Sequence, residues 1–205
     1  MRKKYVFIVV IMAFIVTGCK DKSNITGEIE ASEREEYVIS AEFIKAKVDG
    51  IHDGDSIFIS YEFNGEPYSG ELYLAGIDAP ELIHPIYKEM PFGKKSKLNL
   101  EKIIQEGSEI YIETNEEGRN NPGGRTIGYA YTTVDGKVIQ LNEMQVKDGL
   151  ARVTDSLANE VDTIIVKENY KKLVELEEKA KSSSLNIWSI ENFITENGYN
   201  EKYKK

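Results

Sequence analysis

Three short clusters in the middle of the chain hold residue types that can bind a cation, activate water or bind an anion. The clusters are Asp53-Gly54-Asp55-Ser56, Ile77-Asp78-Ala79-Pro80-Glu81 and Gly124-Arg125. Each one alone has a simpler interpretation, because Asp and Gly favour turns, Pro can end a strand, and an arginine after two glycines is usually exposed. The three clusters can form one catalytic or binding site only if the strands and helices of the fold bring them together.

Around the first cluster, the alternation of residue types predicts a β-meander. A strand over residues 41–48 leads into the Asp-Gly-Asp turn. Residues 56–63 alternate with a period of two, which is the period of a β-strand. Asn64-Gly65 can supply the positive φ angles of a tight hairpin, and a returning strand is predicted over residues 66–75.

The segment after the meander predicts further strands and helices. A proline at the start, a glycine at the end and an apolar stripe predict a helix over residues 91–107. Two strands are predicted over residues 108–114 and 126–134, then a short helix ending near Gly149 and a longer helix over residues 159–182. This order of elements predicts an α+β fold, a five-stranded β-barrel of OB type with about three helices. It has five strands, a helix after the third strand and more helices at the end.

The N-terminus has the layout of an export signal. A basic start, Met1-Arg2-Lys3-Lys4, precedes an apolar run of about a dozen residues, which is too short for a comfortable membrane span. The run ends in Val16-Thr17-Gly18-Cys19, which resembles the bacterial lipobox, where cleavage precedes a cysteine that then carries a lipid. Cys19 is the one cysteine in 205 residues, so an internal disulfide is excluded. An ordinary signal peptide or an N-terminal membrane anchor is the alternative.

These features predict four parts along the chain. Residues 1–18 are the signal peptide of a lipoprotein, and residues 19–40 are the lipidated cysteine with a flexible tether, because this stretch is polar and lacks an apolar period. Residues 41–190 suit one domain with a single core, and residues 191–205 are expected to form a C-terminal tail. The expected product is a monomer, exported and lipid-anchored to the cell membrane, with its domain on the extracytoplasmic side.

The three clusters and their surroundings resemble the micrococcal-nuclease (thermonuclease) family over about residues 42–190. The matching motifs agree with the family in order and spacing: Asp53-Gly54-Asp55, Gly76-Ile77-Asp78-Ala79-Pro80-Glu81, His84-Pro85, Gly124-Arg125, Gly149-Leu150-Ala151 and Leu185-Asn186-Ile187-Trp188-Ser189. The resemblance implies a calcium-dependent phosphodiesterase that takes nucleic acid, DNA or RNA or both, as its substrate.

The resemblance also implies a role for each matched residue. Asp55 and Asp78 correspond to the calcium-binding carboxylates, and the main-chain carbonyl of Ala79 corresponds to a third ligand, in keeping with the preference of Ca²⁺ for oxygen. Glu81 corresponds to the carboxylate that orients or deprotonates the attacking water. Arg125 corresponds to the arginine that binds the phosphate and helps the leaving oxygen depart.

The sequence departs from the family on the phosphate-binding side. Tyr73 stands where the family has a second arginine, and a phenol cannot make a bidentate charged contact with phosphate. Such a loss could cost on the order of 10²–10⁵ in rate. Pro122-Gly123 and Asp155 replace residues that bind the nucleotide in the family. By position, Tyr73 and Arg119 are expected to face the substrate.

The charge balance leaves a choice between hypotheses. The net charge is −9, whereas proteins that bind polyanions usually carry a basic face. The chain could be a working phosphodiesterase, a catalytically weakened nuclease fold that binds nucleic acid or a partner, or a surface lipoprotein with a structural calcium site. The presence of a water-activating Glu81 beside a pair of metal-binding carboxylates favours the first hypothesis, because a pure binding module has no need for it.

Overall fold

The structure is a computed structural model, and it describes residues 37–82, 89–119, 124–154 and 164–203. No helix within these ranges has the length and hydropathy required to cross a membrane. Several features that the sequence singled out lie outside the described residues: the signal peptide, Cys19, most of the tether, His84-Pro85, Pro122-Gly123 and Asp155.

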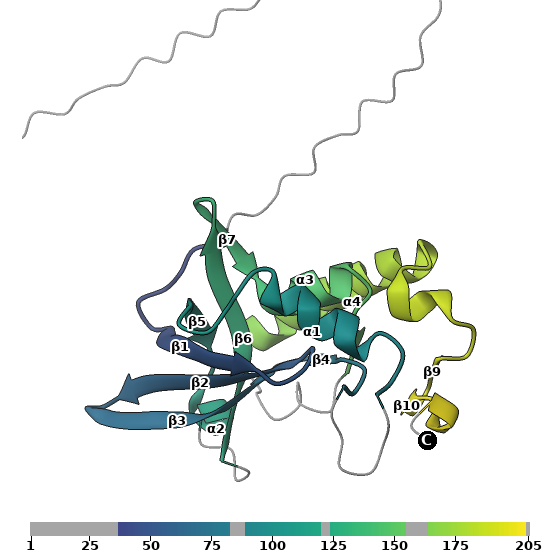
Figure 1. Cartoon of the computed structure of the whole chain (residues 1–205). Helices are drawn as coiled ribbons and strands as arrows, with labels where there is room; N and C mark the ends of the chain where they lie inside the picture. Colours follow the sequence, from purple (N-terminus) through teal and green to yellow (C-terminus); the bar gives the residue numbers. More distant parts are fainter. Residues whose placement is uncertain (1–36, 83–88, 120–123, 155–163, 204–205) are drawn as a thin grey trace, which may run out of the picture. The chain divides into compact units, whose positions relative to one another are not determined.

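Five strands close into a mixed β-barrel (Figure 1), which confirms the predicted α+β fold of OB type. The first three strands form the predicted antiparallel meander, and the other two complete the barrel. Their bounds are β1 Ile44–Ile51, β2 Ser56–Phe63, β3 Glu66–Leu74, β5 Glu109–Glu113 and β6 Arg125–Val134. β5 pairs with β1 on one side and with β6 on the other, and a parallel pairing of β3 with β6 closes the barrel.

Three of the helices, α1 (Gly93–Glu101), α3 (Leu141–Lys147) and α4 (Ile164–Ser182), lie together on one side of the barrel, and the short α2 (Glu116–Arg119) lies apart from them (Figure 1). The helix predicted over residues 91–107 is shorter in the structure, ending at Glu101. The chain then turns back to the barrel, where the amide of Gly107, at a φ of +83°, donates to the carbonyl of Val48 at 2.8 Å.

Three short strands before the C-terminal segment were not predicted, because two to four residues are too few to reveal a period. β7 (Lys137–Gln140) extends the sheet beside β6. β4 (Ile77–Asp78) pairs with β8 (Arg152–Val153) in an antiparallel pair outside the main sheet. This pair joins the second cluster of the sequence to the segment after α3.

The segment that was expected to be a tail, residues 191–205, is folded through Tyr203. It contains the hairpin strands β9 (Ile194–Thr195) and β10 (Gly198–Tyr199), followed by a 3₁₀ helix at Glu201–Tyr203. A second hydrophobic cluster holds it in place, formed by Met90, Ile187, Phe193 and Tyr199. Sequence reasoning missed it because isolated buried aromatics follow no period.

Contacts at the start of the domain also extend beyond the expected boundary at residue 41. The ring of Tyr37 packs edge-on against Tyr131, with ring centroids 5.4 Å apart. Its hydroxyl also donates a hydrogen bond to Glu143 on α3.

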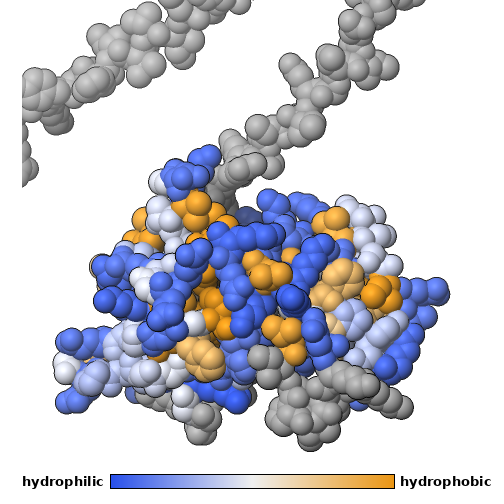
Figure 2. All heavy atoms as spheres, viewed as in Figure 1, coloured by the Kyte–Doolittle hydropathy of each residue, from blue (hydrophilic) through white to orange (hydrophobic). Residues whose placement is uncertain are grey.

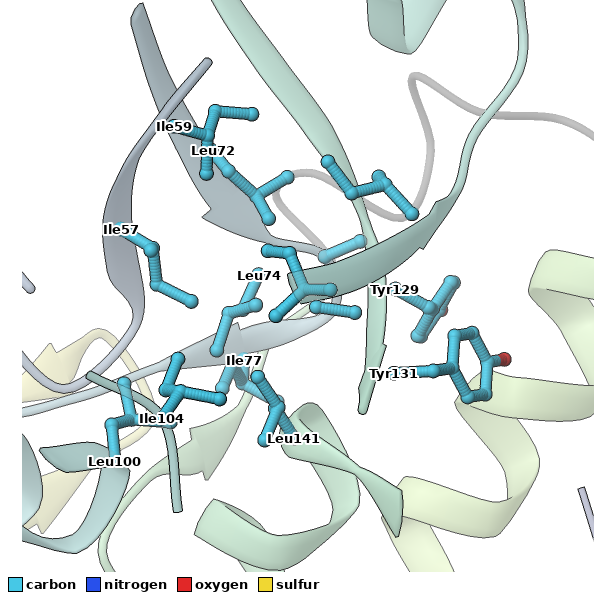
Figure 3. Close-up of a cluster of buried hydrophobic side chains, with 14 of the residues drawn as sticks. Ile57, Ile59, Leu72, Leu74, Ile77, Leu100, Ile104, Tyr129, Tyr131 and Leu141 are labelled. Carbon is cyan, nitrogen blue, oxygen red and sulfur yellow. The ribbon is translucent and has the colours of Figure 1, made fainter. Parts of the chain in front are cut away.

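The barrel interior determines which side chains point outward. Figure 3 shows Ile57 and Ile59 of β2 converging with Leu72 and Leu74 of β3, and all four are buried. The core continues through residues of α1, the segment after it, α3, β4 and β6: Leu100, Ile104, Leu141, Ile77, Tyr129 and Tyr131. Because alternate residues of a strand face opposite sides, Phe58, Glu71 and Tyr73 lie on the outer face of the barrel. Arg125 is the β6 partner of Glu71 and lies beside it on this face.

Candidate functional site

The Asp-Gly-Asp turn joins β1 to β2, and buried hydrogen bonds hold it. Ser56 Oγ donates to Asp53 Oδ1 at 2.6 Å inside the turn. From α3, the buried Gln145 side chain donates to the Gly54 carbonyl at 2.6 Å and to the Ser96 carbonyl at 3.0 Å. One amide group therefore fastens the turn to both α1 and α3.

Gly54 is required for space and not for a left-handed backbone. A Cβ at this position would lie 1.9 Å from Ser96 Oγ and 2.7 Å from the Cβ of Ala79. This close approach lets the main-chain amide of Ala79 donate to Asp55 Oδ2 at 2.6 Å. The structure thus brings Asp55 and Ala79, which are 24 residues apart, into direct contact.

The electrostatics of Asp55 suit a cation site. Removal from solvent raises the pKa of Asp55 well above its usual range, and the neighbouring carboxylates of Asp53 and Asp78 raise it further. Carboxylates crowded in this way are stabilised by a bound cation, and oxygen donors are the ligands that Ca²⁺ prefers. The residues present therefore fit the ion. Within the described ranges, no three His, Cys, Asp or Glu side chains form a group that could hold a metal ion, so the two carboxylates would need further oxygen ligands from the main chain or from water.

Asp78 is held from two sides. Arg152, its partner across the β4–β8 pair, places Nε 2.7 Å and Nη2 2.6 Å from Asp78 Oδ2. The hydroxyl of Tyr199, from the C-terminal hairpin, donates to the Asp78 carbonyl at 2.7 Å. Sequence reasoning missed both residues, because neither contact follows from a motif or a spacing.

Helix α1 supports the backbone of Glu81. The Met90 amide donates to the Glu81 carbonyl at 2.9 Å. A Cβ at Gly93, the first residue of α1, would lie 2.8 Å from the same carbonyl oxygen. The start of the helix therefore packs directly on the main chain of Glu81, which holds the backbone of this residue in place beyond β4.

Arg125 lies over Tyr73 on the outer face of the barrel. The guanidinium carbon is 4.6 Å from the centre of the Tyr73 ring, and Nε is 3.8 Å from Glu71 Oε2. Burial raises the pKa of Tyr73 to about 12, with Glu71 adding to the shift and Arg125 opposing it, so the hydroxyl stays neutral. Tyr73 pairs with Ser56 across β2 and β3, which places it beside the Asp-Gly-Asp turn.

Glu71 and His52 are further members of this face that sequence reasoning did not single out. His52 Nδ1 lies 2.5 Å from Glu71 Oε1, while the other oxygen of Glu71 faces Arg125. The signal was available for Glu71, because it precedes Tyr73 by two residues on a predicted strand and so shares its face.

Arg119 is separated from the other candidates. Its guanidinium carbon lies 4.2 Å from the centre of the Phe63 ring, at the opposite end of β2 from the Asp-Gly-Asp turn. Its Nε is buried, and no hydrogen-bond partner for it lies among the described residues. The structure thus joins Asp55 to Ala79 by a hydrogen bond, with Asp78 next to Ala79 in the chain and near enough to raise the pKa of Asp55. It places Tyr73 with Arg125, and Arg119 elsewhere.

Comparison with known proteins shows which family the chain belongs to. A family model described as staphylococcal nuclease homologue matches residues 71–190, which is more than half of the chain. The chain belongs to the staphylococcal nuclease family. The matched range includes Asp78, Ala79, Glu81 and Arg125 and begins after Asp55, which the hydrogen bond from Ala79 ties to it.

Named relatives in the staphylococcal nuclease family are similar over most of this chain. The SPbeta prophage-derived endonuclease YokF of Bacillus subtilis (strain 168) is 32% identical over 159 residues, covering 78% of this chain and 49% of that protein. This chain therefore spans about half the length of that relative. Endonuclease YncB of the same organism is 29% identical over 160 residues, covering 77% and 67%. Thermonuclease of Staphylococcus intermedius is 27% identical over 136 residues, covering 66% and 71%.

Proposed function

We propose that this member of the staphylococcal nuclease family is a calcium-dependent nuclease that hydrolyses phosphodiester bonds in DNA, RNA or both. The observation that carries the proposal is the hydrogen bond of 2.6 Å from the Ala79 amide to Asp55, which joins two separate acidic motifs at one place. Relatives whose names are endonuclease and thermonuclease support the same activity.

Three groups would hold the ion: the carboxylates of Asp55 and Asp78 and the main-chain carbonyl of Ala79. Bound there, Ca²⁺ would supply positive charge against the charge that builds on the phosphoryl oxygens. The raised pKa of Asp55 supports this assignment, since nearby negative charge is one of its causes.

The remaining steps belong to side chains of the chain itself. Glu81, beyond β4, positions a water molecule and accepts its proton as the water attacks phosphorus. Arg125 binds the phosphate through its guanidinium and stabilises the charge that develops during attack. Its half-exposed side chain can reach a substrate from the surface, and Tyr73 and Glu71 restrict where the guanidinium lies.

We further propose that activity is reduced relative to enzymes with two arginines at this site. Tyr73 is a neutral donor, so one charged contact to the phosphate is replaced by at most one neutral hydrogen bond. In the limiting case the chain would bind nucleic acid or a partner without turnover, which is the second candidate function.

We also propose that the domain is displayed on the extracytoplasmic side of the cell membrane through a lipid on Cys19. Acyl chains contribute about 0.8 kcal/mol per buried methylene, which is enough for two chains to hold a soluble domain at a membrane surface. No obligate protein partner is invoked, and the active form would be a monomer.

Digestion of plasmid DNA and of RNA by the purified protein tests the proposal. Cleavage is expected with millimolar Ca²⁺ and not with a chelator. The control is Glu81→Gln, which keeps the size of the side chain and removes the base. If a folded, calcium-binding protein cleaves neither substrate at high concentration, the binding function replaces the nuclease, and equal cleavage by Glu81→Gln would remove Glu81 from the mechanism.

A further inference from the structure

An exposed phenylalanine lies beside the candidate site on the outer face of β2. Phe58 is 43% exposed, although its strand neighbours Ile57 and Ile59 are buried in the barrel. Its ring stacks on the imidazole of His52, with ring centroids 5.2 Å apart and planes 26° from parallel. One face of the aromatic pair is therefore built into the protein, and much of the Phe58 ring remains open to solvent.

The stack is held in position. His52 Nδ1 lies 2.5 Å from Glu71 Oε1, and the Glu71 side chain is only 15% exposed. A ring that is already fixed loses little conformational freedom when a ligand packs on it. The Phe58–His52 pair is therefore better prepared to receive a flat ligand than an isolated surface phenylalanine would be.

The strand register places this pair next to the arginine proposed to bind phosphate. Phe58 is the β2 partner of Glu71 on β3, and Glu71 is the β3 partner of Arg125 on β6. Phe58 and Arg125 are thus two strands apart on one face, about 10 Å between their backbones. A strand of nucleic acid whose phosphate lies on Arg125 has a neighbouring base within reach of the Phe58 ring.

We propose that the Phe58–His52 pair is a stacking subsite for an unpaired nucleobase of the strand whose phosphate Arg125 binds. This inference rests on the proposed function, because it assumes that Arg125 contacts a nucleic-acid phosphate. The exposed part of the subsite is the single aromatic ring of Phe58, and the charged side chains of Glu71 and Arg125 flank it. Such a surface suits a flat polar ring better than an acyl chain. In the view of Figure 2, hydrophobic side chains form separate groups among hydrophilic ones, with no broad apolar surface.

The subsite requires a base with one free face. In a duplex, both faces of a base are covered by its neighbours, so the subsite selects single-stranded segments or frayed ends. Stacking on an aromatic side chain is tolerant of sequence, because every base has a π face. The pair therefore adds affinity for single strands without specifying which base is bound.

Binding of a short oligonucleotide tests the subsite without depending on cleavage. The full chain carrying Glu81→Gln is titrated, with Ca²⁺ present, into a fluorescein-labelled single-stranded octathymidylate and into a fully abasic strand of the same length. Adding Phe58→Ala is expected to weaken binding of the octathymidylate about tenfold, and to leave binding of the abasic strand within twofold. Phe58→Trp keeps a flat ring and should preserve the affinity.

Phe63→Ala is the matched control, because Phe63 is a second exposed phenylalanine at the far end of the same strand. It should change octathymidylate binding less than twofold. Equal binding by the Phe58→Ala protein, equal weakening on both strands, or no binding of the octathymidylate would each overturn the subsite. Digestion by the protein with Glu81 intact is measured separately. If that protein does not cleave nucleic acid but Phe58→Ala weakens binding of the octathymidylate alone, the nuclease proposal is wrong and the subsite stands. If it cleaves and Phe58→Ala leaves binding unchanged, the nuclease proposal stands and the subsite is wrong.

Discussion

Arg152 places two nitrogens on a single carboxylate oxygen of Asp78, Nε at 2.7 Å and Nη2 at 2.6 Å. The same aspartate is proposed to bind calcium, so a built-in cation lies beside the place that an external cation would take. The C-terminal hairpin packs behind this pair, since a Cβ at Gly198 would lie 3.0 Å from Arg152 Nη2. The hairpin therefore helps to determine where Arg152 lies.

Removal of the Arg152 cation is expected to tighten calcium binding. Arg152→Ala leaves the charge of Asp78 uncompensated, and a partly exposed pair of this kind is worth about 1 kcal/mol, or roughly fivefold in affinity. Isothermal titration with Ca²⁺ measures the change, and Arg152→Lys, which keeps the charge, should stay near the parent value. Weaker calcium binding by Arg152→Ala would show instead that Arg152 orients Asp78 for the ion.

Tyr73→Arg is expected to raise the turnover of nucleic acid at least tenfold. The change sacrifices the ring under Arg125, a cation–π contact worth about 0.5–1 kcal/mol at an exposed site. A second charged contact to the phosphate contributes more, of the order of 10²–10³ in rate at comparable sites. Initial rates on a labelled substrate measure the gain, with Tyr73→Phe as the control that keeps the ring. Unchanged turnover would mean that the site compensates for the missing arginine in another way.

Gly54→Ala is expected to destabilise the domain by about 2–3 kcal/mol, because the new methyl group overlaps Ser96 and Ala79 in a packed interior. Urea denaturation followed by circular dichroism gives the free energy of unfolding. Gly50→Ala is the matched control, since its nearest neighbour would be a Phe58 carbon at 3.8 Å. Equal effects at the two positions would contradict the close approach of the turn to α1.

The raised pKa of Asp55 predicts how stability depends on pH when calcium is chelated. The folded protein holds this proton more tightly than the unfolded chain, so stability falls as pH rises from the usual carboxyl range through the raised pKa. Asp55→Asn should therefore be more stable than the parent near neutral pH, and the difference should shrink in acid. Thermal melts from pH 4 to 8 in a chelator check this. A constant difference between the two proteins across that range would rule out Asp55 as the titrating group.

Cys19→Ala is expected to move the protein from the membrane fraction to the soluble fraction. The anchor is proposed to be a lipid on this cysteine, and the substitution removes its attachment point. Fractionation of cells followed by immunoblotting makes the measurement, with Ser23→Ala as a control in the adjoining segment. Continued retention of the Cys19→Ala protein in the membrane would refute the lipid anchor.

Local pattern was sufficient for much of the barrel. The alternation predicted β2 and the returning β3, and the structure has both strands, with Ile57, Ile59, Leu72 and Leu74 buried on one face. These strands were predictable because each has eight or nine residues with one face in the core, which gives a clear period of two. The same parity placed Tyr73 on the outer face.

The sequence by itself determined the family and the motifs, because residue type and spacing are properties of the chain. Only the tertiary structure decided which residues meet. The contact of Asp55 with Ala79 depends on a turn packed against α1, and the pairing of Asp78 with Arg152 depends on two strands of two residues each. Arg119 was expected, with Tyr73, to face the substrate, yet its guanidinium packs on Phe63 at the other end of β2. Such contacts depend on how segments far apart in the sequence pack together, and the spacing of residues within one segment does not predict them.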